Sequence, residues 1–203
     1  MTSSTNYSGA RTAAVKAATD LYGASSSQCA GVATAFSAIN VAGTTCGTTP
    51  PPPGGNKIVN PGFESGATSW TQTPGVISND PTRARTGSWL GWLDGYGTTH
   101  TDTLSQSVAI PSASSATLSL WLKVTTSESG TTPYDTLKVQ VVSGATTTTL
   151  ATYSNANASS GYVQRTLNSS SYVGRTVTIK LVGAEDSTLA TSFFVDDFSL
   201  TTA

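Results

Sequence analysis

From about residue 56 onward, hydrophobic and polar residues alternate with a period of two, the pattern of β-strands that bury one face. Turn-forming pairs such as Ser143-Gly144 and Ser160-Gly161 separate the alternating runs. The apolar positions of four runs are Leu104, Val108 and Ile110; Leu118, Leu120, Leu122 and Val124; Leu137, Val139 and Val141; and Val177, Ile179 and Leu181. About eight to ten short strands of this kind predict a mainly β protein, an antiparallel sandwich or jelly roll.

The segment before residue 44 has helical periodicity instead. Ser8 can cap a first helix that runs to Tyr22, and Gly23 follows its end. Ser25 and Gln28 form a capping-box pattern before a second helix. The apolar positions are Ala14, Val15, Ala18, Leu21 and Tyr22 in the first helix and Cys29, Val32, Phe36 and Ile39 in the second. Two such helices bury little by themselves, so we expect them to be part of a larger domain.

Residues 44–55 separate the two patterns. Four consecutive prolines, Pro50 to Pro53, precede Gly54 and Gly55. Consecutive prolines favour extended polyproline geometry, so this segment is predicted to be a semi-rigid spacer with a flexible joint. We therefore divide the chain into a helical segment (residues 1–43), a linker (44–55) and a β-sandwich (56–203).

Composition narrows the classes of partner. Lys and Arg number 10 against 11 Asp and Glu, which gives a net charge of −1 and no basic surface for nucleic acid. No apolar run approaches the roughly 18 residues that a membrane span needs. The chain has two cysteines, Cys29 and Cys46, whose spacing fits neither a redox pair nor a zinc knuckle. The Lys-poor composition favours export and a Cys29–Cys46 disulfide, although two unrelated free thiols remain an alternative.

The helical segment resembles the C-terminal helices of thermolysin-like secreted zinc metallopeptidases. The resemblance rests on Asn6-Tyr7-Ser8-Gly9-Ala10-Arg11, Ala17-Ala18-Thr19-Asp20-Leu21-Tyr22-Gly23 and Ala35-Phe36-Ser37-Ala38-Ile39-Asn40-Val41. Phe36 stands where that family more often has Trp. The family's zinc ligands lie upstream of this segment, so zinc is expected only in a catalytic domain that this chain lacks. With a single histidine, His100, the chain cannot supply the usual ligands of a catalytic zinc, and no catalytic residue is carried over.

The remainder resembles the galactose-binding-like jelly rolls of carbohydrate-binding modules. The opening Asn60-Pro61-Gly62-Phe63-Glu64-Ser65-Gly66, with Trp70 following, resembles their first strand, and Phe193-Phe194-Val195-Asp196-Asp197-Phe198-Ser199-Leu200 resembles their last. Gln106-Ser107-Val108-Ala109-Ile110-Pro111 and Leu118-Ser119-Leu120-Trp121-Leu122-Lys123 fit between them. Similar domains are appended to secreted bacterial proteases, which agrees with the first resemblance.

The last strand changes its alternation at the aspartate pair. Phe193 and Val195 have one parity, whereas Phe198 and Leu200 have the other, so a β-bulge at Asp196-Asp197 would bring both sets into the core. The resemblance places Glu64 and one of these aspartates, Asp197 by preference, at a structural calcium site that clamps the first and last strands together. The alternative is that the acids are solvated or cap turns.

Catalysis finds no support in the pattern of residues. Glu64 and the aspartate pair come from distant strands, which gives no reason to expect a glycosidase pair. Asp94, His100 and Asp102 lie in a Gly- and Thr-rich stretch that we interpret as a loop, not as part of a triad. Aromatic residues are the remaining candidates for sugar stacking, foremost Trp121, Tyr96 and Tyr134, although most of the chain's aromatics are expected to be packing residues.

Together these features predict a non-catalytic accessory region of a secreted, extracellular bacterial zinc metalloendopeptidase. Its partner would be a protein or polysaccharide substrate surface, with neither nucleic acid nor membrane involved, and its oligomeric state is left open. The alternative is an independent carbohydrate-binding module of a secreted protein.

Overall fold

The computed structural model describes residues 7–22, 27–39, 41 and 55–203. The chain divides into two compact units, residues 1–52 and 53–203, and each is described by itself. The predicted spacer lies outside the described residues apart from Gly55, and so do Cys46 and the proposed cap Ser25.

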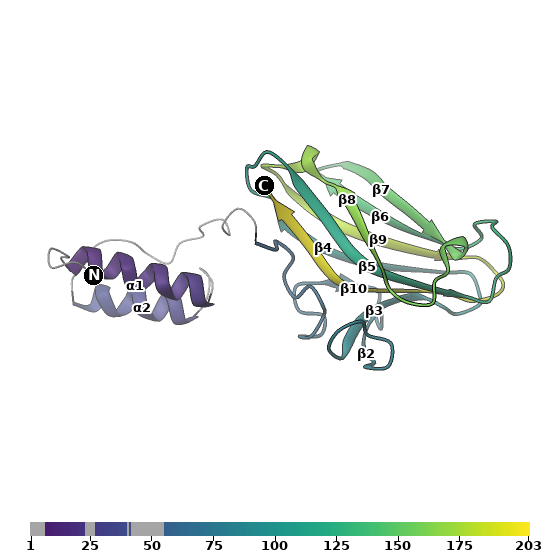
Figure 1. Cartoon of the computed structure of the whole chain (residues 1–203), viewed down its shortest axis with the longest axis horizontal. Helices are drawn as coiled ribbons and strands as arrows, with labels where there is room; N and C mark the ends of the chain where they lie inside the picture. The colour runs from purple at the N-terminus through teal and green to yellow at the C-terminus, as the bar shows by residue number, and fades with distance from the viewer. Residues whose placement is uncertain (1–6, 23–26, 40, 42–54) are drawn as a thin grey trace. The chain divides into compact units, whose positions relative to one another are not determined.

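The first unit is a pair of helices, α1 (Tyr7–Tyr22) and α2 (Ser27–Ala38), which lie side by side (Figure 1). Their shared core consists of Val15 and Ala18 from α1 and Cys29 and Ala33 from α2. Arg11 is buried and links the helices through a hydrogen bond to Ser37 Oγ, 3.1 Å long, and another to the Val41 carbonyl.

Two positions of the predicted helical seams are not buried. Leu21 is 73% exposed and Ile39 is 63% exposed, although both were expected on the apolar faces. A pair of short helices can cover only one stripe on each, so apolar residues away from that stripe remain at the surface.

The second unit is a sandwich of two antiparallel sheets (Figure 1), which confirms the predicted mainly β fold preceded by two helices. Across residues 55–203, one sheet has the strand order β1-β4-β9-β6-β7 and the other β2-β3-β10-β5-β8. The strands are β1 (Thr71–Gln72), β2 (Ile77–Asn79), β3 (Trp89–Asp94), β4 (His100–Ala109), β5 (Ala116–Thr126), β6 (Thr136–Ser143), β7 (Thr146–Ser154), β8 (Val163–Asn168), β9 (Thr176–Glu185) and β10 (Thr191–Thr202), with short 3₁₀ turns η1 (Asn155–Asn157) and η2 (Ser170–Tyr172).

The apolar positions of the four alternating runs all lie in the core between the sheets, each with at most 3% of its surface exposed. An aromatic cluster joins the opening loop to the last strand. The ring centroid of Phe63 lies 5.1 Å from that of Trp70 and 5.8 Å from that of Phe198, in tilted and edge-on arrangements that aromatic pairs favour. The Phe198 amide also donates to the Pro61 carbonyl over 3.0 Å, so residues near both ends of the sandwich are held together.

Strand β10 contains the predicted bulge. Its pairing with β5 shifts between Asp196 and Ser199, and Asp197 has a φ of 45°. The residues on both sides of the shift are buried, Phe193 and Val195 before it and Phe198 after it. The extra residue therefore restores the inward direction of the apolar side chains, and it turns the two aspartates toward neighbouring loops.

Candidate functional site

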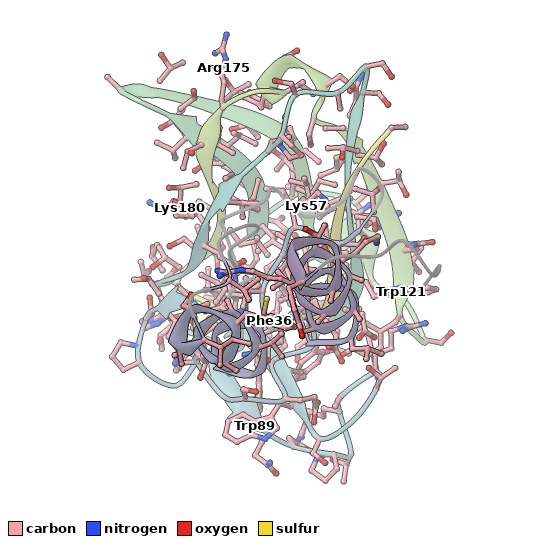
Figure 2. All side chains as sticks on the ribbon, turned by 90° about the vertical axis from the view of Figure 1, so that its left-hand side faces the viewer. Phe36, Lys57, Trp89, Trp121, Arg175 and Lys180 are labelled. Carbon is pink, nitrogen blue, oxygen red and sulfur yellow. The ribbon has the colours of Figure 1, made fainter. Side chains whose placement is uncertain are left out.

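Large aromatic side chains lie on the outer face of the sheet β2-β3-β10-β5-β8. The rings of Trp92 on β3 and Phe194 on β10 have centroids 5.3 Å apart. Trp121 lies on β5, at a position that alternates with the buried leucines of that strand. Figure 2 shows Trp121 and Lys180 on opposite sides of the sandwich, as expected for residues on the outer faces of different sheets.

The loop of residues 80–88 covers part of this aromatic face. The guanidinium carbon of Arg83 lies 4.9 Å from the centroid of the Trp92 ring, and that of Arg85 lies 3.6 Å from the Trp121 ring, both cation–π contacts. The hydroxyl of Tyr162 fixes the loop by donating to the Arg83 carbonyl over 2.8 Å. Trp121, a predicted ligand contact, thus has one ring face covered by Arg85.

A hollow of about 510 Å³ opens beside this loop. Trp92 and Tyr96 contribute aromatic rings to its lining, while Ser78, Asn79 and Asp80 contribute a hydroxyl, an amide and a carboxylate. This combination is typical of small-molecule sites, in which apolar surface provides area and a few polar groups fix the orientation of the ligand.

Asp80 keeps its negative charge at the rim of this hollow. Its Oδ1 accepts hydrogen bonds from the amide and hydroxyl of Thr82, at 3.0 and 2.6 Å, and its Oδ2 pairs with Arg83. The hydrogen bonds from Thr82 and Arg83 lower the pKa of Asp80 to about 2. At neutral pH Asp80 is therefore an ionised hydrogen-bond acceptor beside the hollow.

The two predicted tyrosines lie in exposed loops. Tyr96 is 56% exposed in the loop after β3, and its ring centroid lies 4.0 Å from that of His100. Tyr134 is 49% exposed in the loop before β6 and is not among the residues that line the hollow. Of the three predicted ligand contacts, only Tyr96 therefore lines the hollow. The other aromatic residue that lines it is Trp92.

The predicted calcium ligands all contact one segment, residues 85–89. Glu64 accepts hydrogen bonds from the amides of Ser88, at 2.9 and 3.1 Å, and Trp89, at 3.0 Å. Asp196 Oδ2 accepts from the amides of Arg85 at 2.9 Å and of Thr86 at 3.2 Å.

Asp197 is held by side chains of the same segment. Its carboxylate accepts from the Arg85 guanidinium at 2.6 Å and from the Thr86 hydroxyl at 2.8 Å. Asp196 is fully buried, and burial raises the pKa of this carboxyl to about 6, with the charge of Asp197 contributing. Through these hydrogen bonds the two aspartates tie β10 to the loop before β3.

A second group of acids, not predicted from the sequence, lies at one end of the sandwich interior. Asp94, Asp102, Asp135 and Glu185 are all buried, with at most 4% of their surface exposed. Asp94 ends β3 in one sheet, whereas the other three belong to or directly precede strands of the opposite sheet. The prediction that Asp94, His100 and Asp102 lie in a loop is therefore wrong, because β3 and β4 extend further toward each other than the Gly and Thr residues between them suggested. The His100 ring nitrogen Nε2 lies 3.1 Å from Asp102 Oδ1.

A signal for this group is present in the alternation. Asp102 shares its parity with Leu104, and Glu185 shares its parity with Leu181, so both acids continue an inward-facing row. Asp135 continues the inward row of Leu137 in the same way. Asp94 could not be found by parity, because its φ of 60° turns its side chain out of the strand pattern.

Within the described residues, no three His, Cys, Asp or Glu side chains already stand at metal-ligand spacing around one point. The helices described in the structure include none that is long and apolar enough to cross a membrane.

Comparison with known proteins confirms both resemblances found in the sequence. Residues 1–41 match the family described as thermolysin metallopeptidase, alpha-helical domain. Among curated proteins, none matches this chain.

Solved structures match the sandwich. A carbohydrate-binding module, TmCBM61 in complex with β-1,4-galactotriose, has 18% identity and a TM-score of 0.53, with 73% of this chain and 99% of that one covered. A xylan-binding domain from CBM 22 has 15% identity and a TM-score of 0.50, with coverage of 75% and 97%. At such identity the likeness establishes the fold alone. The chain thus joins a segment similar to the thermolysin α-helical domain to a sandwich that has the fold of carbohydrate-binding modules.

Proposed function

We propose that this chain is a non-catalytic accessory region of a secreted zinc metalloendopeptidase, and that its sandwich binds polysaccharide. The observation that carries the proposal is the hollow beside Trp92 and Tyr96, on a sandwich whose structural relatives include modules solved with, or named for, carbohydrate ligands. Any peptide hydrolysis would take place in a catalytic domain that holds the zinc.

The chemistry of the hollow suits a sugar. The C–H faces of a pyranose ring pack well on aromatic rings. Tyr96 offers an exposed ring, and Trp92 offers the part of its ring that Arg83 and Phe194 leave uncovered, while the sugar hydroxyl groups require donors and acceptors. Asn79 offers both a donor and an acceptor, and Asp80 offers an ionised acceptor. The volume of about 510 Å³ lies in the ordinary range for small-molecule sites and has room for one or two sugar units.

The helical unit supports the connection to a peptidase. Tyr7, Leu21 and Ile39 are exposed on a unit whose core is small. Within the described part of this unit, a core of four residues is small for a complete domain, which agrees with a similarity to one lobe of a larger catalytic domain. The alternative, an independent carbohydrate-binding module, gives no reason for residues 1–41 to match the thermolysin α-helical domain.

Retention on insoluble polysaccharides tests the proposal. The 203-residue chain is mixed with galactan, xylan and cellulose and, in parallel, with casein and collagen, and the bound fraction is measured. We expect retention on at least one polysaccharide, competed by its soluble oligosaccharide, and no cleavage of casein. Retention on the proteins alone would contradict polysaccharide binding and leave a protein-binding accessory role.

We also propose a structural calcium ion at Glu64, Asp196 and Asp197. The donors suit calcium, because all are carboxylate oxygens and Asp196 is fully buried. Calcium would supply positive charge between the three acids. Without the ion, hydrogen bonds to these carboxylates already hold residues 85–89. Its ligands would exchange some of the present hydrogen bonds for the ion.

A Cys29–Cys46 disulfide remains part of the proposal. Cys29 is fully buried between the two helices, with its sulfur 3.2 Å from Thr19 Oγ1. A bridge from this position would fasten the segment after α2 to the helix pair, and it would form in the oxidising environment outside the cell.

A further inference from the structure

Asp94 is a buried carboxylate without a hydrogen-bond partner. Only 4% of the residue is exposed, and neither Oδ1 nor Oδ2 has a partner within hydrogen-bonding distance. An ionised carboxylate that is removed from water without compensation costs several kcal/mol, so such a group ordinarily has a cation, a proton or a set of donors beside it.

The surroundings of Asp94 are acidic as well. Asp102 Oδ2 accepts the Asp94 amide over 2.9 Å, so its carboxylate lies directly beside this residue. Burial raises the pKa of Asp94 to about 8, and the charges of Asp102 and Glu185 add to the effect. The charge of Asp135 also raises the pKa of Asp94, and the buried Oδ2 of Asp135 has no hydrogen-bond partner.

The backbone is shaped around this group. Asp94 lies over Gly183 of β9, where a Cβ atom would stand 2.2 Å from Asp94 Oδ2, so the missing side chain leaves the space that the carboxylate occupies. Glu185 accepts the amides of Tyr96 at 2.9 Å, Gly97 at 2.8 Å and Thr191 at 3.2 Å. The group therefore joins both sheets and the loop that carries Tyr96.

The four buried acids have little positive charge beside them. Among the described residues, the ion pairs include only one that involves this group, between His100 and Asp102. One partly exposed imidazole cannot balance four buried carboxyl groups. Three buried carboxylate oxygens of this acidic group, two on Asp94 and one on Asp135, thus have no hydrogen-bond partner.

We propose that a divalent cation binds between Asp94, Asp102, Asp135 and Glu185, at a site separate from Glu64, Asp196 and Asp197. Calcium suits it, because calcium takes six to eight oxygen ligands in irregular geometry and tolerates carboxylates that close onto it only when it binds. The ion would connect β3 to the opposite sheet and fix the loop that places Tyr96 beside the hollow.

The test counts bound ions on the full chain. After dialysis against a chelator and then against chelator-free buffer, calcium is titrated calorimetrically into wild type, Asp94→Asn and Asp196→Asn. Asp80→Asn is the matched control, because Asp80 and Asp94 both line the hollow beside Trp92, but Asp80 is paired with Thr82 and Arg83. We expect Asp94→Asn to lose the ion at this second site, one per chain. Asp80→Asn should keep the ion at this site, and so should Asp196→Asn.

Thermal unfolding provides a second readout. At a hundredfold excess of calcium over its Kd, the Tm of wild type should rise by roughly 5–10 °C, and the part of that rise due to this site should be lost in Asp94→Asn. Identical ion counts for wild type and Asp94→Asn would overturn the proposal and leave Asp94 a protonated acid. Should Asp94→Asn fail to fold, Asp196→Asn decides, since a variant that binds no calcium would contradict a second site.

Discussion

The carboxylate of Asp94 lies so close to Gly183 that a side chain at the glycine would collide with it, 2.2 Å separating Asp94 Oδ2 from the position of a Cβ. This contact joins the end of β3 in one sheet to β9 in the other sheet, at the end of the sandwich where the buried acids lie. The same loop after β3 carries Tyr96, one wall of the hollow. Packing inside the sandwich and the shape of the proposed ligand site are therefore connected through a few residues.

Without bound metal, the raised pKa of Asp94 should make the sandwich less stable as pH rises. The folded protein holds a proton on Asp94 up to about pH 8, whereas an unfolded aspartate releases it near pH 3.8. Between these values the folded state binds more protons, so the free energy of unfolding falls with increasing pH. The charges of Asp102, Glu185 and Asp135 raise the pKa of Asp94 further, while His100 lies beside Asp102 and Tyr96 lies in the adjoining loop.

Urea unfolding in chelator at pH 5 and pH 8 measures this effect. Wild type should lose stability from pH 5 to pH 8, and Asp94→Asn should lose clearly less, because its amide does not titrate. Asp80→Asn serves as the control, since the pKa of Asp80 is already low in the folded state. Equal losses in wild type and Asp94→Asn would mean that Asp94 does not hold the proton.

Phe198→Ala should destabilise the sandwich by about 3–5 kcal/mol, the usual cost of removing a buried phenylalanine. Phe198 has 1% of its surface exposed and contacts the rings of both Phe63 and Trp70. Chemical denaturation followed by tryptophan fluorescence gives the value. Tyr134→Ala removes a comparable ring from an exposed position and should cost less than about 1 kcal/mol; a Phe198→Ala loss no larger than this would show that the cluster is not a core element.

Asp196→Asn should abolish part of the calcium stabilisation even if the second ion is bound. The residue is buried at the bulge and contacts the amides of Arg85 and Thr86, which a proposed calcium would help to hold. Differential scanning calorimetry in calcium and in chelator should show a smaller difference in Tm for this variant than for wild type. An unchanged difference would return these carboxylates to the role of loop caps.

Reduction should affect the helix pair and leave the sandwich unchanged. A disulfide that closes a loop of this length stabilises by roughly 3 kcal/mol in the loop-entropy account. Hydrogen exchange of α1 and α2 should therefore quicken in reductant, while exchange in β5 and β10 stays the same. Equal exchange of the helices with and without reductant, or a mass that shows two free thiols, would contradict the disulfide.

The alternation of residues was sufficient to predict the sandwich, because burial of one face of each strand fixes parity. It was also sufficient to predict the bulge in β10, where two buried rows of opposite parity can only be reconciled by an extra residue. In the helices the same reasoning was less successful: Leu21 and Ile39 follow an apolar pattern but lie exposed, since a pattern does not tell which partner covers it.

The sites were harder to predict. Asp94, His100 and Asp102 were predicted to lie in a loop, because Gly and Thr surround them in the sequence, whereas Asp94 ends β3 and the other two lie in β4. Their meeting depends on the sheet register, which pairs Asp102 with Gly183, and on a left-handed residue at Asp94. Similarly, Trp121 has the parity of a surface residue, but Arg85 from a distant loop covers its ring.

Affinity for soluble polysaccharide, measured for wild type and Trp92→Ala by electrophoresis in polysaccharide-containing gels, tests the central claim most directly. Trp92 provides the larger ring of the hollow, so its loss should weaken binding at least tenfold, and Tyr96→Ala should weaken it as well. Tyr134→Ala, outside the hollow, should bind as wild type does. Wild-type retardation that Trp92→Ala and Tyr96→Ala leave unchanged would contradict the hollow as the binding site, and no retardation on any polysaccharide would contradict carbohydrate binding itself.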